Sequence, residues 1–191
     1  FVGALSYDAG MKGNKGSPPE GGTRVPAFFR WPGHIMPGHC DRLAAHVDIM
    51  PTLIELCGGK LPPGLRIDGR SLVPLLNDPG AEWDDRFVFV HRGRWDFGKA
   101  AQSKFAQCAV RTQRFRLVNN SELYDIPADP GETRNVIASF PDEVAAMRTA
   151  YNQWWREVLP AMINEEVPAA AEAPYAVLYE QQRSTIGIPD W

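Results

Sequence analysis

"KGSPPEGGTRVPAFFRWPGHIMPG", residues 15–38, changes from a flexible, charged half to an apolar half. Glycines in the first half permit positive φ angles and a close approach of backbones, so they predict a tight loop. Lys15 adds a compact positive charge with three hydrogen-bond donors, which suits a tetrahedral oxyanion. Residues 24–31, bounded by Gly22 and by a Pro-Gly pair, predict a short buried strand.

The loop does not match the sequence patterns of the common phosphate-binding motifs. Neither the Walker pattern G-x-x-x-x-G-K-[ST] nor the dinucleotide pattern G-x-G-x-x-G fits residues 10–22. Composition alone leaves two interpretations open, a solvated surface turn and an anion site. Lys12 is expected to be a solvated neighbour of Lys15.

The composition of the 191 residues is that of a folded domain, or of a large part of a larger protein. Hydrophobic residues make up 44% and charged residues 23%, which argues against a disordered chain. The net charge of −3 argues against a nucleic-acid partner. No stretch approaches the roughly 18 apolar residues of a membrane span, so no membrane partner is expected. The three cysteines lack CxxC spacing, which excludes a structural zinc site; either one disulfide with a free thiol or three unpaired thiols fits them.

Hydrophobic periodicity predicts a small sheet covered by a helix. A first helix is expected after Asp48, which we interpret as its N-cap, up to Gly58-Gly59. Residues 141–159 carry apolar side chains at three- and four-residue steps and predict the longest helix, packed on the sheet. The sheet is expected to be antiparallel, with three or four strands from the segments 86–90, 108–112, 115–118 and 122–126.

Four blocks, in order, resemble the formylglycine-dependent sulfatase (arylsulfatase) family. The first is the stretch quoted above, in which the family has a lysine-glycine pair, EGG-x-R-x-P, an apolar strand and a WPG turn. The other three are HVDIMPTLIELCG at 46–58, IDGRSLVPLL at 67–76 and ELYDIPADPGETRNV at 122–136. Together they cover about residues 10 to 136, which makes the resemblance far more specific than any single motif.

The resemblance implies the C-terminal portion of an α/β, alkaline-phosphatase-like fold. Residues 1–80 would be the C-terminal part of the main α/β domain. Residues 81–160 would form a smaller subdomain with the antiparallel sheet and its helix, and residues 161–191 an extended tail that wraps around the body. The implied activity of the whole enzyme is sulfate-ester hydrolysis.

The resemblance assigns one catalytic residue to this chain. Lys15 stands where the family has the lysine that reaches the sulfate of the substrate, so it would act as a catalytic and substrate-binding residue. His91 and Arg92 follow a predicted strand, and in the family such a loop often contributes to the substrate pocket; the alternative is an ordinary exposed basic loop.

The family's cofactors are not expected to be bound by this chain. No cysteine or serine stands in the C/S-x-P-x-R context that yields formylglycine. Asp8 is followed by Ala9-Gly10 rather than Asn-Gly, so we do not expect it to be a calcium ligand, and no metal ligand is assigned. Both Ca²⁺ and formylglycine would belong to the full-length enzyme, and this fragment alone should be inactive.

Two other functions remain open at this point. A phosphoesterase or phosphonate hydrolase of the same superfamily would also use a lysine-lined anion pocket. A non-catalytic scaffold module would have kept the fold and lost the site. The expected partners are a sulfated small molecule or sugar and the missing N-terminal part of the enzyme, and the resemblance implies a periplasmic or secreted location.

Overall fold

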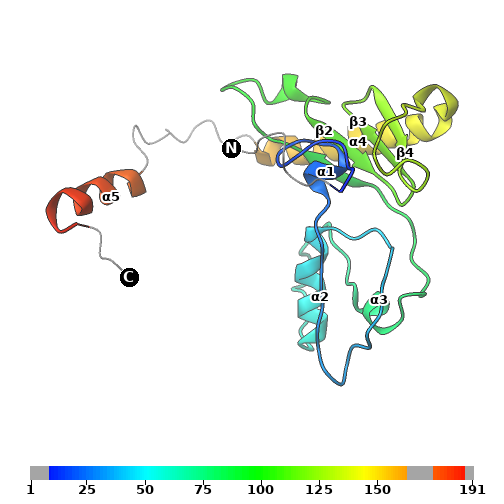
Figure 1. Cartoon of the computed structure of the whole chain (residues 1–191), viewed down its shortest axis with the longest axis horizontal. Helices are drawn as coiled ribbons and strands as arrows, with labels where there is room; N and C mark the ends of the chain where they lie inside the picture. Colours follow the sequence, from blue (N-terminus) through cyan, green and yellow to red (C-terminus); the bar gives the residue numbers. More distant parts are fainter. Residues whose placement is uncertain (1–8, 163–173, 188–191) are drawn as a thin grey trace.

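A four-stranded antiparallel sheet is the centre of the fold. The structure is a computed structural model that describes residues 9–162 and 174–187. The strands pair in sequence order (Figure 1) and are β1 (Val88–His91), β2 (Cys108–Arg111), β3 (Phe115–Val118) and β4 (Glu122–Asp125). Asn119 and Asn120, both with positive φ, turn the chain between β3 and β4. The expected antiparallel sheet is therefore confirmed, with four strands.

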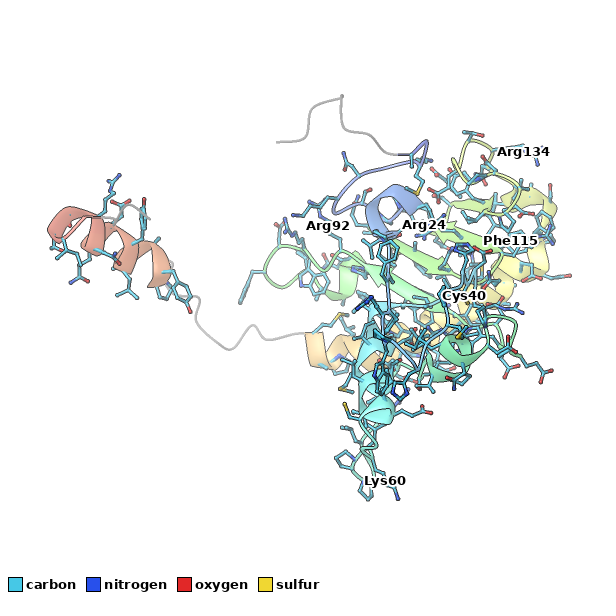
Figure 2. All side chains as sticks on the ribbon, turned by 60° about the horizontal axis from the view of Figure 1, so that its bottom comes forward. Arg24, Cys40, Lys60, Arg92, Phe115 and Arg134 are labelled. Carbon is cyan, nitrogen blue, oxygen red and sulfur yellow. The ribbon has the colours of Figure 1, made fainter. Side chains whose placement is uncertain are left out.

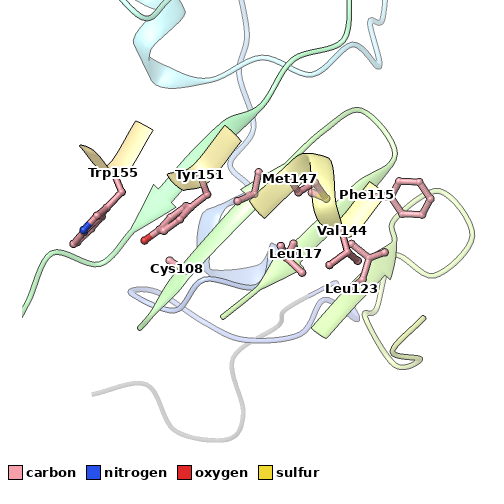
Figure 3. Close-up of a cluster of buried hydrophobic side chains, with 9 residues drawn as sticks. Cys108, Phe115, Leu117, Leu123, Val144, Met147, Tyr151 and Trp155 are labelled. Carbon is pink, nitrogen blue, oxygen red and sulfur yellow. The ribbon is translucent and has the colours of Figure 1, made fainter. Parts of the chain in front are cut away.

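One face of the sheet packs against helix α4 (Pro141–Met162). Side chains alternate along a strand, so every second residue points to this face. Figure 3 shows them meeting the buried residues of α4, and the whole cluster consists of Cys108, Val110, Phe115, Leu117, Leu123, Val144, Met147, Tyr151 and Trp155. The expected packing of the helix on the sheet is confirmed.

The opposite face of the sheet carries the alternate residues and lies under the N-terminal loop. Ala109, Val118, Tyr124 and Ile126 form a small buried cluster on this face. The loop ends in the short helix α1 (Glu20–Thr23), whose Glu20 is buried. Two arginines of the sheet, from β2 and β3, reach the loop from this face and take the place of a second apolar layer.

A second group of elements lies beside the sheet and is held by one buried carboxylate. It contains α2 (Ile49–Leu56), preceded by a 3₁₀ turn (His46–Asp48), and α3 (Val73–Asn77). Asp48 is fully buried; it accepts hydrogen bonds from Ala45 N (2.7 Å), Arg70 N (3.0 Å) and the Arg86 guanidinium. Burial opposes its ionisation, but these donors outweigh burial and lower the pKa of Asp48. Asp48 occupies the N-cap position of α2, but its side chain caps nothing in the helix and joins three segments instead.

The structure differs from the sequence expectations at two segments. Residues 24–31 form no strand, and Val25 and Phe28 are 76% and 91% exposed, so the expectation of a short buried strand is wrong for this chain. An isolated strand is not stable without a neighbour that satisfies its N–H and C=O groups, and the described residues offer none. Beyond α4, the part of the expected extended tail that is described forms a helix instead, α5 (Pro174–Thr185). Its Ala, Leu, Glu, Gln and Arg residues favour helix, and Pro174 occupies its first position.

The remaining 3₁₀ turns are short, at Ala101–Ser103 and Ile137–Ser139. Helix α4 runs three residues beyond its expected end and includes Pro160 in its last turn. None of the described helices is long and apolar enough to cross a membrane. All three cysteines are unpaired, with Cys108 buried and Cys40 and Cys57 exposed.

Candidate functional site

The N-terminal loop is fixed to β4 by Lys12. Its ammonium donates to Glu122 Oε2 at 2.9 Å and to Tyr124 Oη at 2.6 Å, and it lies 4.8 Å from the centre of the Tyr124 ring. The hydrogen bond to Tyr124, together with the Glu122 carboxylate, raises the pKa of Lys12. Lys12 is therefore a structural anchor rather than the solvated neighbour that its sequence position suggested.

A buried charge network fixes the other end of the loop. Arg116 of β3 donates to Pro18 O at 2.7 Å and to Glu20 Oε2 at 2.5 Å. Glu132 accepts a hydrogen bond from the backbone N–H of Glu20 at 2.8 Å. Arg111 Nε lies 3.6 Å from Glu20 Oε2, which gives two arginines and two glutamates in one cluster. These contacts hold the backbone from Pro18 to Glu20 against the sheet.

Two buried atoms of this network have no hydrogen-bond partner among the described residues. The side chain of Glu132 is fully buried, and its Oε1 lies 3.6 Å from Arg116 Nε, although neither atom has a hydrogen-bond partner among the described residues. Burial also raises the pKa of Glu132, more than the nearby arginine and backbone donor lower it. Since removing one member of a buried ion cluster leaves an uncompensated charge, the geometry of the loop depends on all four side chains.

Two glycines allow the loop to fold back on itself. A Cβ atom on Gly21 would lie 2.7 Å from Gly13 O, and one on Gly22 would lie 2.1 Å from Ser17 O. Both distances are shorter than any side chain tolerates, and the atoms in the way belong to the backbone. The EGG sequence is therefore required by the turn that brings α1 over the lysine loop.

Lys15 lies between these two anchors and lines an open cavity. Its side chain is exposed, and no carboxylate among the described residues pairs with it. The cavity has a volume of about 410 Å³. One wall consists of the loop, with Lys15, Gly16, Ser17, Pro18, Gly22 and Thr23.

The other wall comes from the end of β1 and the loop that follows it. It consists of Val90, His91, Arg92, Arg94 and Gln107. Figure 2 shows Arg92 on the side of the molecule where α1 and Arg24 lie. Two segments far apart in the sequence thus meet at one basic cavity.

His91 holds this second wall in place. Its Nε2 donates to Ser103 O at 3.1 Å, and its Nδ1 accepts from Gly93 N at 3.1 Å, which fixes the neutral tautomer. The ring lies against Trp155 at 4.8 Å and against Trp95 at 5.7 Å between centres. Burial lowers the pKa of His91. Both ring nitrogens are thus engaged inside the protein.

All three site residues expected from the sequence, Lys15, His91 and Arg92, lie on this one cavity. The anchoring roles of Lys12, Arg116 and Glu132 were not predicted from the sequence. One signal was available: the strand FRLV alternates a basic residue with apolar ones, which places Arg116 on the face away from the core.

The described residues contain no cluster of three or more His, Cys, Asp or Glu side chains that could hold a metal ion. Asp8, which the sequence analysis weighed as a calcium ligand, lies outside the described residues. The charged side chains that line the cavity are all basic and come from Lys15, Arg92 and Arg94.

Comparisons with known proteins point to one family. Residues 19–154 match the family described as N-sulphoglucosamine sulphohydrolase, C-terminal. The chain is 34% identical to arylsulfatase A of Bos taurus over 158 residues, which cover 71% of this chain and 30% of that protein. It is 36% identical to the steryl-sulfatase of Mus musculus over 105 residues, which cover 50% of this chain and 16% of that protein.

A solved structure shares the fold of nearly the whole chain. The crystal structure of Ps i-CgsB in complex with k-i-k-neocarrahexaose superposes with a TM-score of 0.67 at 23% identity, covering 92% of this chain and 37% of that chain. The chain spans less than a third of the length of the two curated relatives above.

Proposed function

Because the chain belongs to the sulfatase family, as the C-terminal portion of its alkaline-phosphatase-like fold, we propose that the protein containing it hydrolyses sulfate esters. The observation that carries the proposal is the placement of Lys15. It is an exposed, unpaired cation at a cavity, on a loop held at both ends by buried or charged contacts.

Lys15 would act on the sulfate group itself. A sulfate ester carries negative charge on its free oxygens, and charge grows on the bridging oxygen as the alcohol leaves. An ammonium fixed beside these oxygens stabilises that charge through charge-assisted hydrogen bonds. The anchored loop means that little reorganisation is needed when the substrate binds.

Arg92 and His91 would shape the substrate side of the cavity in different ways. The guanidinium of Arg92 is exposed and unpaired among the described residues, so it is free to contact the substrate. His91 would line the cavity and fix the turn that carries Arg92, because both of its ring nitrogens are already bonded.

The family's formylglycine and Ca²⁺ would supply the nucleophile and hold the sulfate oxygens. The described residues do not fit either group, since they contain no group of three or more His, Cys, Asp or Glu side chains that could hold a metal ion and no C/S-x-P-x-R sequence. We therefore assign both to the N-terminal part of the full-length enzyme, and we expect this chain by itself to be inactive.

That N-terminal part is also the partner we propose for the exposed apolar surface of this chain. Residues 24–36 expose Val25, Phe28, Trp31 and Met36, and helix α2 exposes Ile49, Met50 and Leu53. Apolar patches of this extent usually mark an interface. A periplasmic or secreted location and a sulfated small molecule or sugar as substrate remain part of the same proposal.

Matched sulfate and phosphate esters of one alcohol, offered to the full-length enzyme, test the proposed reaction. We expect kcat/KM to be higher for the sulfate ester. Preference for the phosphate ester would make the protein a phosphoesterase of the same superfamily, and turnover of neither would indicate a scaffold module.

A further inference from the structure

The cavity around Lys15 carries more positive charge than one sulfate ester requires. A sulfate monoester has a single negative charge, which one ammonium balances. Arg92 and Arg94 line the same cavity, both are exposed, and neither has a carboxylate partner among the described residues. None of the residues that line the cavity is acidic.

The neighbouring cations of the lysine loop and the sheet are paired, unlike those of the cavity. Three residues before Lys15, the ammonium of Lys12 is paired with Glu122. On the same face of the sheet, Arg111 and Arg116 are both matched by Glu20. Lys15, Arg92 and Arg94 bring three like charges to one cavity, and like charges repel one another unless an anion lies between them.

Hydrogen bonds fix the backbone at Arg92 and at Gly93, the residue between the two arginines. Arg92 N donates to Gln107 O at 3.0 Å, and Gly93 N donates to His91 Nδ1 at 3.1 Å. Gly93 has a φ of 62°, which lets the chain turn sharply between the two arginines. A guanidinium on such a turn loses less conformational freedom on binding, and its planar fork suits a carboxylate or a sulfate.

We propose that Arg92 and Arg94 form a second anion subsite, so that the preferred substrate carries another acidic group besides the sulfate that is hydrolysed. This inference rests on the proposed function and adds the substrate class to it. The second group is a carboxylate or a second sulfate. Both are oxyanions, planar in the carboxylate and tetrahedral in the sulfate, and a guanidinium binds either through charge-assisted hydrogen bonds. The substrate is therefore at least doubly negative.

The test uses the full-length enzyme and two matched pairs of substrates. The first pair is the sulfate ester of a hydroxybenzoic acid and the sulfate ester of its methyl ester, which differ by one carboxylate charge. The second pair is an aromatic disulfate and the corresponding monosulfate. We expect kcat/KM to be about tenfold higher for the acidic member of at least one pair, the size of about one charge-assisted contact, mainly through a lower KM. The pair that shows the preference identifies the second group.

Variants of Arg92 and Arg94 test whether these two residues cause the preference for the acidic substrate. In Arg92→Ala, in Arg94→Ala and in the double variant, the ratio of kcat/KM between the acidic and neutral substrates should fall towards one. The control is Arg134→Ala, because Arg134 is also an exposed arginine and lies well apart from Arg92 (Figure 2); this variant should leave the ratio unchanged. If an alanine variant does not fold, Arg92→Gln and Arg94→Gln remove the charge at similar size.

Three outcomes would contradict the inference, and each of them can be told apart from the others. Equal kcat/KM for both members of both pairs would overturn the second subsite and leave sulfate hydrolysis intact. A preference that survives the double variant would place the subsite elsewhere and also overturn the inference. Turnover of none of the four esters would overturn the proposed function, and the inference with it.

Discussion

Lys12 and Lys15 are the same residue three positions apart, and their surroundings give them opposite roles. The Lys12 ammonium donates hydrogen bonds to Glu122 and Tyr124, whereas Lys15 has no carboxylate partner among the described residues and lines the cavity. The sequence predicts that Lys15 is the catalytic lysine, because Lys15 stands at the family's position before EGG. It could not predict the anchor, because Glu122 is 110 positions away and its pairing follows from the register of β4 over the loop.

Arg116 should affect catalysis through the position of Lys15. In Arg116→Lys the charge remains, but an ammonium lacks the fork that reaches Pro18 O and Glu20 together. We expect kcat of the full-length enzyme to fall by about tenfold, the cost of losing roughly one charge-assisted contact.

A double-variant comparison separates positioning from general damage. If Arg116 acts through Lys15, adding Arg116→Lys to Lys15→Ala should cause little further loss of kcat, because residues that act as a unit are not additive. Full multiplication of the two losses would show that Arg116 only stabilises the fold.

The elements of the sheet and its helix were predictable because their signals are local. Strand β3 lies within the segment RFRLV, in which basic and apolar residues alternate, and α4 follows its three- and four-residue apolar steps. The strand predicted for residues 24–31 is not formed, because an apolar run becomes a strand only beside a partner strand, and no local pattern shows whether a partner is present. The ion pairs beside the site could not be predicted from local sequence either, because Arg116 and Glu132 contact Glu20 only after the sheet has formed.

Strand β1 and the loop after it should be sensitive to acid because of His91. Burial lowers the pKa of His91, so the folded protein prefers the neutral ring more strongly than the unfolded chain does. Its contribution to stability is then complete above the ordinary pKa of about 6.5 and is lost as the pH falls through the lower folded value.

The measurement is the free energy of unfolding between pH 7.5 and pH 5, for the wild type and for His91→Gln. The wild type should lose more stability than the variant over this range, because Gln does not titrate. Equal losses would mean that His91 does not carry the acid sensitivity.

At the scale of the whole molecule, the exposed apolar surface predicts different behaviour of the chain alone and in the full-length enzyme. Phe28 is 91% exposed here, so Phe28→Ala should change the stability of the isolated chain by no more than about 0.5 kcal/mol. If the N-terminal part covers this side chain, the same substitution should cost about 3–5 kcal/mol in the full-length enzyme. Unfolding of both proteins by denaturant checks this, and equal small effects would contradict the proposed interface.

The most direct test of the account is the turnover of Lys15→Ala in the full-length enzyme with a sulfate ester. The matched control is Lys60→Ala, because Lys60 is also exposed and lies shortly after the end of α2, well apart from α1 (Figure 2). We predict that Lys15→Ala lowers kcat by about a hundredfold, the scale of losing one oxyanion stabiliser, with unchanged thermal stability, while Lys60→Ala keeps wild-type turnover. Wild-type turnover from Lys15→Ala would contradict the account and leave the lysine loop with a structural role only.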